Sequence, residues 1–162
     1  MGPGAYTAIL DVLAAVLHSL TDVFQQIVSR PAEGGVSVNL HFSVETPWLA
    51  VQAERADKGR LLIVSKQPGE VRVRVPRWTP RETLRLAASG RILPLRWDGS
   101  YLRVPARDAS TNTLIQLTYE LPARETVEIM PISRRQFRLN WRGDEVVACD
   151  PEVPIYPALK VN

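Results

Sequence analysis

The spacing of apolar residues changes once along the chain, at the glycine pair Gly34–Gly35. In residues 5–28 apolar side chains recur at steps of three and four, which places them along one side of an α-helix. From Val36 onward they alternate with polar residues, which is the period of a strand with one buried face. Pro31 and the two glycines end the helical pattern and open a turn. The sequence therefore predicts one helix followed by an all-β region.

The predicted helix is apolar over more than one stripe. Its main stripe and the flank beside it contain Leu10, Leu13, Leu17, Leu20 and Phe24, with Val12, Ala15 and Val23 next to them. A β-sandwich offers a helix a single docking surface, so part of this apolar area needs another partner. We expect either a further domain or a second copy of the chain to cover it.

The clearest strand signal is Val71–Val75, in which three valines face one way while Arg72 and Arg74 face the other. Similar short segments follow one another, separated by turn signals such as Asp98-Gly99 and Gly143-Asp144. Roughly ten such strands are typical of an antiparallel β-sandwich. We therefore expect a mainly β fold preceded by one amphipathic α-helix. The expected division is an N-terminal helix in residues 1–34, a β-sandwich in 35–150 and an extended, proline-rich tail in 151–162.

Basic charge is concentrated in one part of the chain. Between Glu54 and Arg107 there are 13 Lys and Arg against 5 Asp and Glu, whereas the net charge of the whole chain is +3. An anionic partner is one interpretation of such a stretch, and a solvated strand face rich in arginine is the other. The arginines alternate with valines rather than with exposed aromatic residues, so we expect no nucleic-acid partner.

We expect no targeting or membrane-spanning segment. The first ten residues lack the positive charge that begins a signal peptide. The most apolar stretch, Ala5–Leu17, contains Asp11 and is well short of the roughly 20 residues that cross a bilayer. No membrane partner is therefore expected, and the compartment stays open, with the cytoplasm as the default.

Residues that often carry catalysis or bind metals are few or isolated. Cys149 is the single cysteine, and His18 and His41 lack the spacing of metal ligands. A glycosidase needs two carboxyl groups that face each other across a sugar. The carboxylates lie beside turns or alternate outward on strands, as at Glu45, Glu120, Glu125 and Glu128. We expect no catalytic residue and no metal site.

The four tryptophans divide into two groups. Trp48 and Trp141 lie within strand patterns, so we expect them in the core. Trp78 and Trp97 lie at strand ends, where a ring either caps the core or forms a platform that holds a sugar beside arginines. Under the second interpretation the carbohydrate-binding residues are Trp78, Trp97 and Tyr101.

The order of several segments is more informative than any single residue. The helix leads into GGVSVNLHFS and ETPWLAVQ, followed by GEVRVRVPRWTPRETLRL, LPLRWDGSYLRVPA, TLIQLTYELPARE and FRLNWRGDEVVACDPEVPIYP. Over about residues 10–157 this order resembles the C-terminal part of glycoside hydrolase family 127, the β-L-arabinofuranosidase-like enzymes. Val36–Phe42 is similar to that family's GVYVNLYF segment, and Val71–Trp78 is similar to its V-x-V-R-I-P-x-W strand.

The resemblance implies a β-sandwich that follows the last helices of an (α/α)6 barrel, with residues 5–28 as the counterpart of a barrel helix. The family's active site lies in the barrel, where a cysteine nucleophile belongs to a zinc-bound cysteine cluster and a glutamate is the acid/base. The family's cysteine pair falls just before this helix, but the matching stretch MGPGAYTAILDV has no cysteine, and Cys149 matches no catalytic position. No catalytic residue or zinc ligand can be carried over, and we expect no cofactor.

Two functions remain open. The first is a non-catalytic accessory sandwich, or a fragment, of a family 127-like glycoside hydrolase that acts on plant-type glycans containing arabinose. Its partner would be the catalytic α/α barrel, or a second copy of the chain bound through the helix. The alternative is a free-standing carbohydrate-binding or protein-interaction module, with a glycan as ligand. The breadth of the apolar helix surface favours the first, because a module that works alone has no use for it.

Overall fold

The computed structural model describes residues 4–151, with side chains from Val12 onward. Over these residues it contains helix α1 (Gly4–Gln25), fourteen strands, and two short 3-10 helices, η1 (Arg81–Thr83) and η2 (Ala106–Asp108). The expected mainly β fold with one preceding helix is confirmed, although the strands outnumber the ten or so that the sequence indicates. Apart from Pro151, the predicted tail at 151–162 lies outside the described residues.

One sheet of the sandwich is built around β6. Its five strands run in the order β1 (Val28–Ser29), β2 (Val36–Val38), β6 (Val71–Arg74), β10 (Tyr101–Val104) and β9 (Trp97–Asp98). The pair β2–β6 is parallel, and the other pairs with a described register are antiparallel. The parallel pair arises because the chain leaves β2 for the opposite sheet and returns only at β6.

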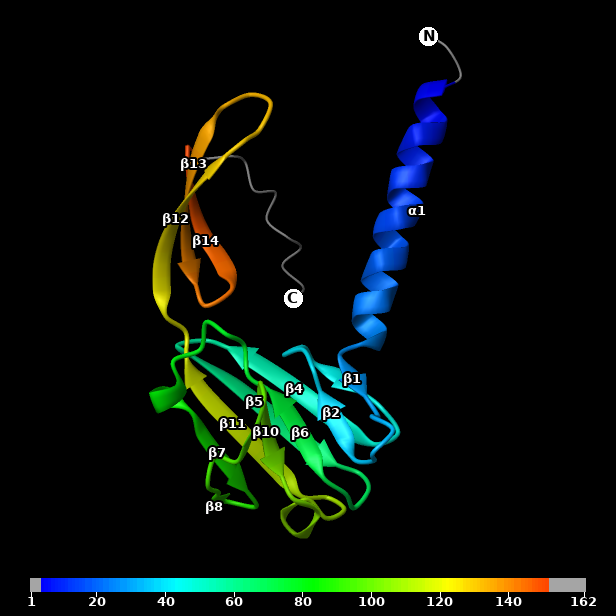
Figure 1. Ribbon diagram of the computed structural model, residues 1–162, viewed down its shortest axis with the longest axis vertical. Coiled ribbons are helices and arrows are strands. Elements are labelled where there is room, and N and C mark those ends of the chain that lie inside the picture. Colours follow the sequence, from blue (N-terminus) through cyan, green and yellow to red (C-terminus); the bar gives the residue numbers. More distant parts are fainter. Residues whose placement is uncertain (1–3, 152–162) are drawn as a thin grey trace.

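The opposite sheet contains six antiparallel strands. Their order is β3 (Val44–Glu45), β4 (Leu49–Arg55), β5 (Lys58–Ser65), β11 (Leu114–Glu120), β7 (Arg85–Ala88) and β8 (Arg91–Ile92). Figure 1 shows the two sheets one behind the other, as in a β-sandwich.

The core lies between these two sheets. In β6, Val71 and Val73 are buried whereas Arg74 is exposed, as the alternation in the sequence predicts. The largest fully buried side chains come from both sheets and include Tyr119, Leu49, Leu61, Ile63, Leu86, Leu102, Ile115 and Leu117. Opposite Tyr119 in the β5–β11 register is Gly59, where a Cβ atom would lie 2.1 Å from the tyrosine ring. Only glycine fits there, because the ring occupies the space of a side chain.

The residues after β11 form a third sheet. Its strands are β12 (Ala123–Ile129), β13 (Gln136–Arg142) and β14 (Glu145–Asp150), all antiparallel, and none of their side chains is buried. In the β13–β14 turn, the Gly143 N–H donates at 2.9 Å to the carbonyl of Pro122, which lies in the link between β11 and β12. The same turn contacts the sandwich through the ion pair of Asp144 with Arg55 of β4. A Cβ atom at Gly143 would lie 3.1 Å from the Trp78 ring. The sequence alternation is the same here as in the sandwich, so it does not separate the two regions.

Helix α1 ends at Gln25 rather than at residue 28 as the apolar spacing predicts. Ile27 continues the three-and-four spacing, but its side chain is buried in the sandwich core. Val28 is also buried and pairs with Val38 of β2. Among residues 4–151, no helix has the length and hydropathy that crossing a membrane requires.

Candidate functional site

Helix α1 carries a wide uncovered apolar surface. Every side chain from Val12 to Gln25 is exposed. Seven large apolar side chains are 49–63% exposed, and they are Val12, Leu13, Val16, Leu17, Leu20, Val23 and Phe24. They form the main stripe and the flank that the sequence predicts. Continuous apolar surface of this kind marks interaction sites on soluble proteins, so α1 is a candidate interface.

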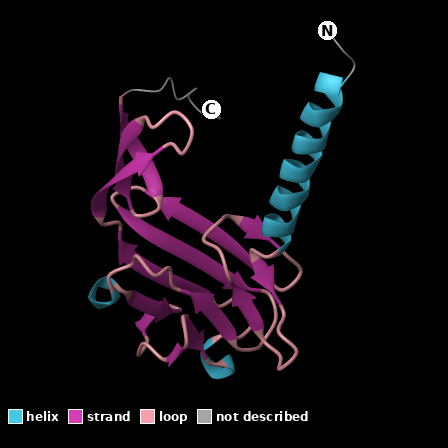
Figure 2. Cartoon of the chain, turned by 45° about the horizontal axis from the view of Figure 1, so that its top comes forward, coloured by secondary structure: helices cyan, strands magenta, loops and turns pink. Residues whose placement is uncertain are grey.

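The third sheet lies on the other side of the same end of the molecule. Figure 1 and Figure 2 both show α1 and β12–β14 projecting from one end of the sandwich, on opposite sides of it. The part of the sandwich between them therefore belongs to the same candidate interface as α1.

Asn39 holds the junction between α1 and the sandwich. Its Nδ2 donates to the Gln26 carbonyl and to the Ser29 hydroxyl, both at 2.9 Å. Its Oδ1 accepts from the Tyr101 hydroxyl at 2.9 Å. A pocket of about 530 Å³ lies at this junction and includes Asn39, Tyr101 and Val23 in its lining. Tyr101, one of the predicted carbohydrate-binding residues, thus has its hydroxyl engaged in positioning the helix.

His41 is buried, and both of its ring nitrogens are hydrogen-bonded. Nε2 lies 2.7 Å from the Arg74 carbonyl oxygen, which can only accept, so Nε2 donates. Nδ1 therefore accepts from the Tyr119 hydroxyl at 2.6 Å. Burial lowers the pKa of His41 to about 4 and raises the pKa of Tyr119 to about 12. The pair is neutral at pH 7, and the imidazole has no lone pair left for a metal or a substrate proton.

A pocket of about 510 Å³ lies beside His41, with Arg55, Arg74, Arg77 and Asp144 in its lining. Arg55 forms an ion pair with Asp144, and Nη2 donates to Oδ2 at 3.3 Å. This pair joins β4 to the β13–β14 turn across 89 positions of sequence, which is why sequence analysis did not single it out. The lining suits polar contacts with a partner rather than acid–base chemistry, because His41 and Asp144 are both already paired.

The three predicted carbohydrate-binding residues lie at separate places. Trp97 lines a pocket of about 340 Å³, and the Arg81 guanidinium carbon lies 4.3 Å from the centroid of its ring. Trp78 packs against Tyr119, with 5.9 Å between ring centroids, close to the third sheet. Tyr101 lies at the α1 junction. Both tryptophans pack against the sandwich core, which is the capping arrangement.

The predicted core position is correct for one of the other two tryptophans and wrong for the second. Trp48 packs against the sandwich core as expected. The expectation for Trp141 is wrong, because β13 belongs to the third sheet and this side chain is only half-buried there. Its Nε1 donates to the Thr126 hydroxyl at 2.9 Å, and Arg124 lies 4.4 Å from its ring centroid.

The other residues that the sequence analysis considered for catalysis or metal binding form no candidate site. Glu45, Glu120 and Glu125 form ion pairs with Lys66, Lys58 and Arg138, respectively. Cys149 is half-buried in β14, and its Sγ lies 3.6 Å from the Pro151 carbonyl oxygen. In the part of the chain that the structure describes, no group of three or more His, Cys, Asp or Glu side chains could hold a metal ion.

These features define a helix-led β-sandwich with an exposed apolar helix at one end. The sequence matches no protein-family model and no curated protein. The fold is similar to a family 127 β-L-arabinofuranosidase from Geobacillus stearothermophilus T6, with a TM-score of 0.50 and 16% identity over 76% of this chain. A second solved structure, described as a glycoside hydrolase, is similar over 69% of this chain, with a TM-score of 0.47 and 21% identity.

In both comparisons this chain spans only 21% of the length of the solved protein. The resemblance to part of a family 127 enzyme, which the order of sequence segments indicates, is thus confirmed at the level of the fold.

Proposed function

We propose that this chain is an accessory β-sandwich of a family 127-like glycoside hydrolase, without a catalytic centre of its own, and that a catalytic α/α barrel covers its helix α1. The observation that carries the proposal is the exposure of α1, whose seven large apolar side chains are all about half exposed or more. The length of the similar enzyme supports it as well, because about four fifths of that protein lies outside the similar part.

The barrel would bind between α1 and the third sheet. At that end of the sandwich His41 bonds to both sheets, and the Arg55–Asp144 ion pair connects the third sheet to β4. Its surface combines the exposed ring of Phe42 with the side chains of Arg74 and Arg77. An apolar centre with arginines beside it is a common composition for a protein–protein interface.

The substrate class of the parent enzyme is a further part of the proposal. The similar solved enzyme is a β-L-arabinofuranosidase, which supports plant-type glycans that contain arabinose as the substrate. This chain would contribute to that reaction by supporting the barrel and not by touching the scissile bond.

A free-standing carbohydrate-binding module has less support. A sugar stacks on an open aromatic face, but Arg81 lies over the face of Trp97 and would have to move. Trp78 is packed against Tyr119 and the β13–β14 turn. Neither ring offers a free platform, whereas the α1 surface is fully open.

A turnover assay tests the absence of a catalytic centre. The purified full chain is incubated with aryl β-L-arabinofuranosides, with and without zinc, beside an active family 127 enzyme as positive control. We expect no turnover under either condition. Turnover that persists in Cys149→Ser would reveal a carboxylate centre, and turnover lost in that variant would make Cys149 a nucleophile. Either result would contradict the proposal.

A further inference from the structure

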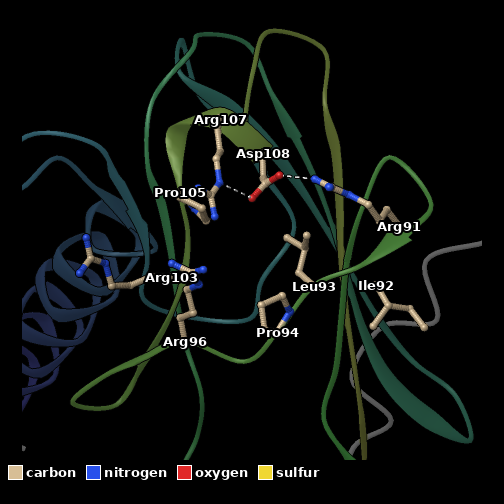
Figure 3. Close-up of a pocket in the computed structure, with 9 residues that line it drawn as sticks. All are labelled: Arg91, Ile92, Leu93, Pro94, Arg96, Arg103, Pro105, Arg107 and Asp108. Carbon is tan, nitrogen blue, oxygen red and sulfur yellow. Dashed lines mark hydrogen bonds and ion pairs between the residues drawn. The ribbon is translucent and has the colours of Figure 1, made fainter.

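A pocket lined by arginines lies at the edge of the sandwich away from α1. It is lined by the edge strand β8, the segment 93–96 that follows it, Arg103 of β10 and the start of η2, whereas α1 joins the sandwich at the edge strand β1. Figure 1 shows β8 far from both α1 and the third sheet. The pocket has a volume of about 410 Å³, and Figure 3 shows its lining of Arg91, Ile92, Leu93, Pro94, Arg96, Arg103, Pro105, Arg107 and Asp108. It would stay accessible when a partner covers the α1 end.

One carboxylate, Asp108, orients two of these arginines. The Asp108 side chain is only 9% exposed, and it pairs with Arg91 and with Arg107, whose Nε lies 3.6 Å from Oδ2. The two arginine side chains are themselves 71% and 70% exposed. Each guanidinium carries five N–H donors, so most of them remain free for a ligand.

The other two arginines differ from each other. Arg103 is neutralised by Glu70, with 2.5 Å between Nη2 and Oε2, and its side chain points away from the pocket. Arg96 points toward the middle of the pocket in Figure 3, and among the residues that the structure describes it has no ion-pair partner. Three arginines therefore face one carboxylate, and the pocket keeps an excess of positive charge.

The rest of the lining is apolar. Leu93 is buried at the base, and Pro94 and Pro105 lie beside the arginines. A small pocket that combines an apolar base with a few converging polar groups is typical of sites for small organic ligands. Guanidinium groups match carboxylate and phosphate oxygens in geometry as well as in charge.

We propose that this pocket binds a sugar-sized organic anion, in which a carboxylate or phosphate contacts Arg96 and Arg107 and a single ring lies on the apolar base. The pocket is separate from the α1 interface, so this proposal and the accessory function can fail independently.

Isothermal titration calorimetry of the full chain tests the proposal with glucuronate, glucose 6-phosphate, glucose and inorganic phosphate. We expect both sugar anions to bind, glucose not to bind, and inorganic phosphate to bind more weakly than glucose 6-phosphate because it lacks the ring. Binding should weaken as salt is added. Arg96→Gln and Arg107→Gln should each reduce the affinity about tenfold, as expected for the loss of a charged hydrogen bond.

Arg77→Gln is the matched control, because Arg77 is an exposed arginine that lines the pocket beside His41 instead. It should leave the affinity unchanged, and thermal unfolding should show that all three variants fold alike. The proposal is wrong if no sugar anion binds, if glucose binds as well as glucuronate, if phosphate alone binds as well as glucose 6-phosphate, or if Arg77→Gln weakens binding as much as Arg96→Gln.

Discussion

His41 joins the two sheets of the sandwich through a single imidazole ring. It accepts from the hydroxyl of Tyr119 on β11 and donates to the Arg74 carbonyl of β6. Protonation would turn Nδ1 into a donor that faces the tyrosine hydroxyl, and it would place a positive charge inside the core. The neighbouring charges act in opposite directions, since Arg55 opposes protonation and Asp144 favours it, and burial outweighs both.

The low pKa of His41 predicts a loss of stability in mild acid. An unfolded histidine titrates near pH 6.5, whereas His41 titrates near 4 in the folded chain, so between these values the unfolded chain binds more protons. The free energy of unfolding should therefore fall as the pH drops, by about 2 kcal/mol between pH 7 and pH 4.5. Urea unfolding at a series of pH values measures this slope.

His41→Gln is the control, because glutamine does not titrate. This variant should be less stable at pH 7 but nearly flat in stability between pH 7 and pH 4.5. The measurement stops at pH 4.5 because three carboxyl groups, those of Glu33, Glu45 and Glu70, have lowered pKa values in the folded chain. Bonded cations lower the pKa values of Glu45 and Glu70, and a backbone N–H has the largest effect on Glu33. The stability that these groups contribute is lost as the pH falls below their unfolded pKa values. An equal slope in the parent chain and in His41→Gln would mean that another group is responsible.

At the scale of elements, strand β6 lies at the centre of its sheet and has two unlike faces. Val73 is fully buried between Val38 of β2 and Leu102 of β10, whereas the Arg74 side chain is exposed. Val73→Asp puts an unpaired charge in the core and should cost several kcal/mol, enough to unfold a marginally stable domain. Arg74→Ser should change stability by about 0.5 kcal/mol or less. Urea unfolding compares the two, and equal effects would mean that the register of β6 is misassigned.

The elements that could be predicted from sequence are those in which the spacing of apolar residues alone determines the type of structure and its buried face. The valines and arginines of β6 show which face is buried without knowledge of any other strand. The end of α1 is different, because Ile27 fits the helical spacing equally well and only its place in the sandwich core excludes it from the helix. The predicted core position of Trp141 is wrong for a similar reason, because the alternation of residues around it does not distinguish a strand of the third sheet from a strand of the sandwich.

The candidate sites could not be predicted from sequence, because they combine side chains that only the folded structure brings together. The sequence shows that arginines are concentrated between Glu54 and Arg107. It does not show that the Asp108 side chain, just beyond this stretch, is largely covered and pairs with Arg91 on one side and Arg107 on the other. Contacts such as His41–Tyr119, 78 positions apart, likewise appear only when the two sheets pack.

The whole molecule has two ends with different properties. One end presents α1, the third sheet and, between them, the surface that contains Phe42, Arg74 and Arg77, and the opposite edge presents the arginine pocket. The proposed accessory role would account for this asymmetry, because the barrel would bury the α1 end while the opposite edge stays in water. If that role is correct, the exposed apolar side chains of α1 should determine how the isolated chain behaves in solution.

We expect the isolated full chain to self-associate through α1 at tens of micromolar. Uncovered apolar area costs about 25 cal/mol per Å² in water, and a second copy supplies the nearest complementary surface. Sedimentation should show a dimer or larger assembly, and Leu17→Gln combined with Leu20→Gln should shift it to monomer. His18→Gln, on the polar side of the same helix, should leave the assembly intact.

Point variants are needed because removing residues 1–34 would also remove β1 and the buried Ile27 and Val28. A full chain that sediments as a monomer would mean that α1 needs no cover, and the accessory role would then lose the observation that carries it.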